Sequence, residues 1–211
     1  MKRFLPICAV CVVAPAVAIL LNFAVPSSRS VAAELATTSP DRIRSVTSAI
    51  DSTTIKANTA TSRDWPTVGL DYAETRYSKL RQITSDNVGD LGLVWSYSLD
   101  SDRGVEATPV VVDGIMYQTA SWSVVHAIDA RTGKKIWTFD PGVNRGEGYR
   151  GCCDAVNRGV ALYQGKVFVA AYDGRLIALD AATGAKLWET DTLIDHDHSY
   201  TITGAPSTAR S

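Results

Sequence analysis

The sequence VHAIDARTGKKIW, residues Val125 to Trp137, returns 51 residues later (188 minus 137) as LIALDAATGAKLW, residues Leu176 to Trp188. Seven of the thirteen positions are identical in the two copies, and the last of them is the tryptophan. Self-similarity at a fixed period near 50 residues is typical of repeat proteins whose unit holds several short strands, as a propeller blade does. The repeat therefore predicts two copies of one β-unit.

The similarity extends upstream of this core. Residues 110–120, VVVDGIMYQTA, align with residues 161–171, ALYQGKVFVAA, and both segments read as a strand, a two-residue turn and a strand. Each unit should then hold about four strands, with repeats at about 107–138 and 158–189. We expect Trp137 and Trp188 to end their last strands as plugs between neighbouring blades, because an indole brings a large apolar area and one N–H that needs a partner. Two similar hairpins in an ordinary β-sandwich are the alternative.

The composition of the 211 residues is that of an ordinary globular protein, with 45% hydrophobic and 20% charged residues. The net charge of −1 indicates no particular partner. We found no basic patch with interleaved aromatic residues, so nucleic-acid binding is disfavoured.

The N-terminus has the pattern of an export signal. Two basic residues precede an uncharged apolar run from Phe4 to Val25, and small residues follow at Val31-Ala32-Ala33. This pattern predicts a secretory signal over residues 1–33 and a periplasmic protein, with an uncleaved membrane anchor as the alternative. Membrane contact is expected only through this segment. Cys8 and Cys11 lie inside the apolar run, which argues against a redox motif or a haem site there.

A segment rich in Ser, Thr and Ala follows over residues 34–63. A short helix is expected from Pro40 to Ile50, with Ser39 as its N-cap. The folded domain is expected to start near Asp64 and to run to residue 211. A strand is expected at Leu93 to Leu99, carrying Trp95.

Cys152 and Cys153 are adjacent, and they are the two cysteines beyond the apolar leader. In an oxidising compartment they should pair with each other or with another chain. Adjacent residues lie closer than the usual Cα range of a disulfide, so a bridge between them forms a strained eight-membered ring. Two unrelated thiols are the alternative.

The residues around this pair carry a family resemblance. GCCDAVNRG at residues 151–159, EATP at 106–109 and TITGAP at 201–206 resemble motifs of the quinoprotein alcohol dehydrogenases, which use pyrroloquinoline quinone (PQQ) and calcium. The segment from Asp64 to Ser78 resembles that family's N-terminal segment. The resemblance covers Asp64 to about Pro206 and implies an all-β fold, an eight-bladed β-propeller with tryptophan-docking repeats, of which this chain holds the first blades as an incomplete ring.

The resemblance assigns cofactor-binding roles to five residues. A Cys152–Cys153 ring would stack on one face of PQQ, Glu106 and Arg158 would bind its polar edge, and Thr203 would hydrogen-bond a carboxylate. An arginine fork and a hydroxyl donor suit a planar ligand with three carboxylates.

The repeat register supports the placement of these residues. Glu106 aligns with Asn157, and Ala107 aligns with Arg158, so the candidates lie at the same end of successive blades.

The three histidines are interpreted more plainly. His126 aligns with Ile177, which favours a position inside the blade over a ligand role. The sequence Asp195-His196-Asp197-His198 could suggest a metal site, but alternation along a strand would place the aspartates and histidines on opposite faces, so a solvated loop is preferred.

The resemblance predicts an exported PQQ- and calcium-dependent enzyme that oxidises primary alcohols to aldehydes and passes electrons to a periplasmic cytochrome c or another acceptor. In the family, the calcium ligands and the catalytic aspartate follow the TGAP segment. We therefore expect these 211 residues to be an N-terminal portion that holds no catalytic or metal-binding residue and is inactive alone. The alternative is a non-catalytic envelope-assembly scaffold, a propeller that shares the tryptophan repeat but has no reason to combine the five candidate residues.

Overall fold

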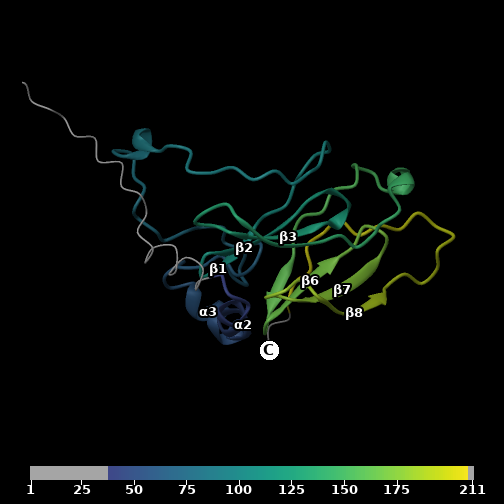
Figure 1. Cartoon of the computed structure of the whole chain (residues 1–211), viewed down its shortest axis with the longest axis horizontal. Coiled ribbons are helices and arrows are strands. Elements are labelled where there is room, and N and C mark those ends of the chain that lie inside the picture. The colour runs from purple at the N-terminus through teal and green to yellow at the C-terminus, as the bar shows by residue number, and fades with distance from the viewer. Residues whose placement is uncertain (1–37, 209–211) are drawn as a thin grey trace, which may run out of the picture.

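The computed structural model describes residues 38–208, and its centre is a pair of four-stranded antiparallel sheets (Figure 1). Each sheet is a simple meander in chain order, β1-β2-β3-β4 and then β5-β6-β7-β8. The strands are β1 (Val110–Val112), β2 (Ile115–Thr119), β3 (Val125–Asp129), β4 (Lys135–Phe139), β5 (Ala161–Tyr163), β6 (Lys166–Ala170), β7 (Arg175–Asp180) and β8 (Lys186–Asp191). The prediction of two repeats with four strands each is confirmed.

The two sheets agree in detail. Tight two-residue turns join β1 to β2 at Asp113-Gly114 and β5 to β6 at Gln164-Gly165, with positive φ at all four residues. This backbone geometry matches the right-handed twist of the strands that it connects. A register shift also recurs at the equivalent place, between Ala127 and Ile128 in one sheet and between Ala178 and Leu179 in the other. The repeated sequence therefore folds as the same blade twice.

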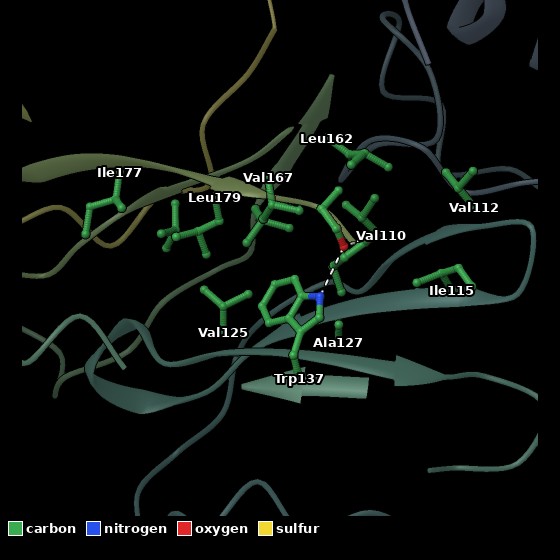
Figure 2. Packing of buried hydrophobic residues seen from close by; sticks show 14 of the residues in the cluster. Val110, Val112, Ile115, Val125, Ala127, Trp137, Leu162, Val167, Ile177 and Leu179 are labelled. Atoms are coloured by element: carbon green, nitrogen blue, oxygen red, sulfur yellow. Dashed lines mark hydrogen bonds between the residues drawn. The ribbon is translucent and has the colours of Figure 1, made fainter. Parts of the chain in front are cut away.

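Trp137 joins the first blade to the second. Its indole N–H donates to the carbonyl oxygen of Ala181 at 3.1 Å, and the side chain is 8% exposed. Figure 2 shows the ring pointing from β4 toward the second sheet, among apolar side chains that include Val167 and Leu179. Gly184 lies directly against the ring, because a Cβ atom there would come within 2.7 Å of it. The turn after β7 thus supplies both the hydrogen-bond acceptor and the bare backbone that the indole requires.

Trp95 makes the same contacts one step earlier. Its indole N–H donates to the carbonyl oxygen of Ala130 at 3.0 Å, and a Cβ atom on Gly133 would lie 2.7 Å from the ring. Ala130 and Gly133 are the repeat equivalents of Ala181 and Gly184. Trp95 is therefore a third member of the tryptophan series. The sequence repeat did not reveal it, because it precedes Trp137 by 42 residues (137 minus 95) rather than by 51.

Two expectations about this series were wrong. Trp188 is 42% exposed, not buried like Trp137, because the described residues include no blade after β8 to supply a carbonyl and a glycine. Its ring contacts only Phe168 among the aromatic side chains of residues 38–208, at 6.0 Å between centroids. Residues 93–99 form no strand, since this segment pairs with no other strand of the described chain.

In the described part of the chain, two α-helices precede the blades. α2 (Pro40–Ser48) begins after Ser39, whose hydroxyl accepts from the Arg42 N–H, so the predicted helix and its cap are confirmed. α3 (Ser52–Asn58) was not predicted; it begins after Asp51, which forms a capping box with Thr54. Figure 1 shows the two helices together at one side of the sheets.

These helices belong to the packed structure. Ile43 and Ile55 are fully buried in the same core as the strands. Backbone N–H groups of Gln164 and Gly165, in the β5–β6 turn, donate to carbonyls at the end of α2 and just after it. Ordered structure therefore extends to the N-terminal side of Asp64, where the sequence analysis expected the folded domain to start. The predicted signal over residues 1–33, with Cys8 and Cys11, lies outside the described residues, and no helix within 38–208 is long and apolar enough to cross a membrane.

His126 lies inside the first blade, as predicted, with 3% exposure. Its Nδ1 atom lies 3.1 Å from the hydroxyl of Tyr97 and 3.3 Å from that of Thr138, and its buried Nε2 atom has no hydrogen-bond partner in the described chain. Burial lowers the pKa of this imidazole from its ordinary value of 6.5, the nearby Asp100 charge opposes the shift, and Lys135 adds to it. The folded blade therefore favours the neutral ring.

We expect this imidazole to make stability depend on pH. A lowered folded-state pKa means that the unfolded chain binds the proton more tightly, so the stabilisation is complete above the unfolded pKa and is lost as pH falls through the folded value. The melting temperature of the wild-type chain should fall between about pH 7.5 and pH 5.5, and that of His126→Gln should fall less over the same range. Equal slopes for the two proteins in thermal melts would contradict this account.

Candidate functional site

Glu106, Arg158 and Thr203 come together although the sequence separates them widely. The Arg158 guanidinium lies 2.9 Å from a carboxylate oxygen of Glu106 and donates to the Thr203 hydroxyl at 2.7 Å. The backbone makes the same junction, since Thr108 N–H donates to the Arg158 carbonyl and Arg158 N–H donates to the Thr203 carbonyl. Three segments therefore meet here: the one before β1, the one before β5 and the C-terminal one.

The charged groups of this cluster remain accessible. The side chains of Arg158 and Glu106 are 44% and 45% exposed, and Thr203 is half-buried. A surface ion pair with this exposure contributes little to stability. The carboxylate of Glu106 and the hydroxyl of Thr203 instead fix the orientation of the Arg158 guanidinium, which stays accessible to a ligand.

Cys152 and Cys153 lie beside this ion pair. Both are exposed, and in the structure they are separate thiols. A hydrogen bond with the Cys152 thiol raises the pKa of Cys153, and the charges of Arg158 and Glu106 also act on it, in opposite directions. All five residues predicted for the cofactor site therefore gather in one place. The disulfide between the cysteines stays a prediction.

Tyr172 supports the loop that carries the cysteines. Its hydroxyl donates to the Gly148 carbonyl at 2.9 Å, and a Cβ atom on Gly151 would lie only 2.2 Å from that hydroxyl oxygen. Any side chain at residue 151 would thus displace either the tyrosine or the loop. The sequence analysis did not single out Tyr172, and the glycine directly before Cys152 was the signal that could have pointed to a close packing partner.

The Asp195–His198 segment is a loop without regular structure, as the sequence analysis preferred. His196 Nε2 lies 2.7 Å from a carboxylate oxygen of Asp191, and His198 Nδ1 lies 2.8 Å from one of Asp195. The two imidazoles thus turn to different carboxylates. Within residues 38–208, no group of three or more His, Cys, Asp or Glu side chains is placed to hold a metal ion.

The donor set of the cluster indicates a class of ligand. An arginine fork and a hydroxyl are suited to planar carboxylates, and a pair of exposed sulfur atoms next to them offers a flat, polarisable contact. This chemistry fits an anionic ligand with a flat surface better than a simple neutral sugar.

Comparison with known proteins agrees with the site. Residues 65–203 match the PQQ family described as "Glucose/ethanol/alcohol dehydrogenase, beta-propeller domain". The quinohemoprotein alcohol dehydrogenase of Comamonas testosteroni is 66% identical over 157 residues, which are 74% of this chain and 22% of that protein. The 1-butanol dehydrogenase (cytochrome c) of Thauera butanivorans is 64% identical over 147 residues, 70% of this chain and 21% of that protein.

Solved structures agree as well. The crystal structure of the Comamonas testosteroni enzyme superposes with a TM-score of 0.77 at 62% identity, over 79% of this chain and 25% of that one. A europium-containing methanol dehydrogenase superposes with a TM-score of 0.65 at 37% identity, over 73% and 28%. The chain spans about a fifth of the length of the curated relatives that it matches. With two propeller blades, the gathered site residues and a family match over residues 65–203, the chain belongs to the β-propeller family of PQQ glucose, ethanol and alcohol dehydrogenases.

Proposed function

We propose that the whole protein is an exported alcohol dehydrogenase that depends on PQQ and calcium and oxidises primary alcohols to aldehydes. The observation that carries this proposal is the junction at Arg158, which joins Glu106 and Thr203 beside the two cysteines. The names of the Comamonas and Thauera relatives support the reaction class, and an enzyme is favoured over a scaffold because a scaffold has no use for this polar cluster.

The residues present fit the cofactor. Arg158 and Thr203 would hold carboxylates at the polar edge of PQQ, with Glu106 completing that edge, and the Cys152–Cys153 unit would lie against one face of the rings. When bound, PQQ would supply the hydride-accepting chemistry of the reaction. The protein's own contribution in this part of the chain is to bind and to orient, which restricts the ligand to one tilt.

Calcium and the electron acceptor are parts of the same proposal. We propose that the calcium ligands of the whole protein follow residues 201–206, as the family resemblance implies. A bound calcium ion would supply Lewis-acid chemistry. The name of the Thauera relative includes cytochrome c, which supports a periplasmic cytochrome as the acceptor. Export is supported by the leader pattern in residues 1–33.

Dye-linked turnover of ethanol and 1-butanol tests this proposal. The whole protein, stripped and then reconstituted, should need both PQQ and calcium for activity. The 211 residues alone should show no turnover, because they contribute one side of the cofactor pocket. Full activity of the whole protein without PQQ, or turnover by the 211 residues at a comparable rate, would overturn it.

We also expect Cys152 and Cys153 to be bridged to each other in exported protein. Their adjacency makes the partner available at every moment, and residues 34–211 contain no other cysteine. Peptide mapping without reductant should recover both residues in one peptide that is two mass units lighter than the dithiol, about the mass of two hydrogens. Two free thiols, or a bridge to another chain, would be the contrary result.

A further inference from the structure

The segment before β1 and the segment before β5 are joined by a second ion pair besides Glu106–Arg158. The Arg103 guanidinium pairs with a carboxylate oxygen of Asp154, the residue directly after Cys153. Arg103 stands three residues before Glu106, and Asp154 stands four residues before Arg158. The two segments are therefore tied at two points that bracket the site.

The two pairs have opposite polarity along the chain. The segment before β1 carries the cation Arg103 and then the anion Glu106. The segment before β5 carries the anion Asp154 and then the cation Arg158. If the segments slipped so that Arg103 approached Arg158, or Glu106 approached Asp154, like charges would face each other. Such repulsion excludes the wrong register as effectively as attraction favours the right one.

Asp154 is held from its own side as well. Its carboxylate accepts from the Ala155 N–H at 2.8 Å, and that bond and Arg103 hold the pKa of this carboxyl below its ordinary value of 3.8. Its φ of 71° places the backbone in the left-handed region directly after the cysteines. Aspartate adopts this region more readily than most residues, because its short side chain can hydrogen-bond to nearby backbone, as it does here to Ala155.

Trp122 forms the other wall of this arrangement. The Arg103 guanidinium lies 5.1 Å from the centre of the indole, and the ring meets Tyr172 edge to face at 5.8 Å. Trp122 N–H donates to the Ala155 carbonyl at 2.8 Å, although Trp122 and Ser123 both have positive φ. Two successive left-handed residues place this indole under the cysteine loop and beneath Arg103.

We propose that Arg103 and Asp154 are positioning residues for the Cys152–Cys153 unit, and that they hold it in register with Glu106 and Arg158. The Asp154 carboxylate is hydrogen-bonded to the backbone of the loop that carries the cysteines. Arg103 lies in the segment before β1, which also carries Glu106, and its guanidinium packs over the indole of Trp122. The inference rests on the proposed function for the use of the cysteines, but it concerns contacts that exist without the cofactor.

The equilibrium between dithiol and disulfide reports on this positioning. In exchange with glutathione disulfide, a bond forms between the two Sγ atoms, the glutathione S–S bond breaks, and the two thiol protons leave with two molecules of glutathione. A loop held by Arg103 has few conformations in either redox form, whereas a released loop gains conformations mainly in the dithiol form. The 211-residue chain, measured without PQQ, should therefore lose up to about fivefold in this equilibrium constant on Asp154→Asn, within the range of a partly exposed ion pair.

Asp154→Asn is chosen because asparagine tolerates positive φ and can still accept from the Ala155 N–H, so only the charge is lost. Arg103→Met should give the same change, and the double variant should give no more than either single one. Asp113→Asn is the matched control: Asp113 also has positive φ, at 48°, and pairs with a distant arginine, Arg42, but lies in the β1–β2 turn. It should leave the constant unchanged.

Three results would overturn the proposal: wild-type constants in folded Asp154→Asn and Arg103→Met, an equal change in Asp113→Asn, or no disulfide in the wild type at any glutathione ratio. If Asp154→Asn does not fold, Arg103→Met gives the decision alone. A separate titration with PQQ distinguishes this inference from the proposed function. Failure of PQQ to bind to the whole protein would count against the function, while a changed constant in the 211-residue chain would leave the positioning role standing.

Discussion

Trp137→Ala is expected to lower the free energy of unfolding by about 3–5 kcal/mol, the cost of removing a buried indole whose cavity cannot collapse. The site is rigid for a definite reason. Gly184 faces the ring with bare backbone and so offers no side chain to fill the space, and Tyr117 already contacts the indole at 5.8 Å between centroids. The carbonyl oxygen of Ala181 keeps one donor after the change, the Tyr117 hydroxyl at 2.9 Å, so the loss is mainly one of packing. Denaturant titration of the 211-residue chain measures it.

Trp188→Ala is the matched control, because Trp188 holds the same position in the second repeat. With 42% of its surface exposed, it should cost about 1 kcal/mol or less. Equal losses for the two variants would show that the indoles act through their strands and not through contact between blades.

We expect Arg158→Met to lower the affinity of the whole protein for PQQ by about tenfold to a hundredfold, the loss that follows when a charge-assisted hydrogen bond to a carboxylate is removed. The fold should tolerate this substitution. The backbone of Arg158, rather than its side chain, bonds to Thr108 and Thr203, and the ion pair with Glu106 is half exposed. Equilibrium dialysis of PQQ against the whole protein, beside thermal melts of the same samples, separates the two effects.

Arg145→Met provides the comparison. Arg145 also pairs with a carboxylate, that of Asp140 at 2.8 Å, and its side chain is 57% exposed, but it lies outside the site. Arg158→Lys should fall between Arg158→Met and the wild type, since lysine keeps the charge but loses the planar fork. If Arg145→Met weakens PQQ binding as much as Arg158→Met does, the effect is one of net charge and the site is misplaced.

The sequence predicted the blades well because a blade is a local structure. The strands, the turn and the bulge of one blade all lie within about 30 residues. The same pattern occurs twice in the sequence, so one copy could be compared with the other. Motif residues were also brought together as predicted, since the resemblance supplied the long-range contacts that spacing alone does not encode.

The features that the sequence did not predict share a physical cause. Each of them depends on a contact with residues that are distant in the sequence. Trp188 has the same sequence neighbours as Trp137, but burial depends on the next blade, and no local pattern reports it. Residues 93–99 have the composition of a strand and lack a partner strand in the described chain. Arg103 and Asp154 were overlooked because a charged residue in a loop usually faces water, and only the fold shows that these two face each other.

The tryptophan contacts run in one direction, and this gives the chain an order of assembly. The indole of Trp95 packs against the turn at Ala130 and Gly133, and that of Trp137 packs against the turn at Ala181 and Gly184. Each indole is therefore covered by residues that lie further along the chain. During synthesis the first blade can form its own strands early, but its outer tryptophan stays uncovered until 47 more residues (184 minus 137) have emerged. Each blade is thus stabilised by its successor. A defect in the turn at Ala181 and Gly184 should therefore expose the indole of Trp137, which belongs to the blade made before it.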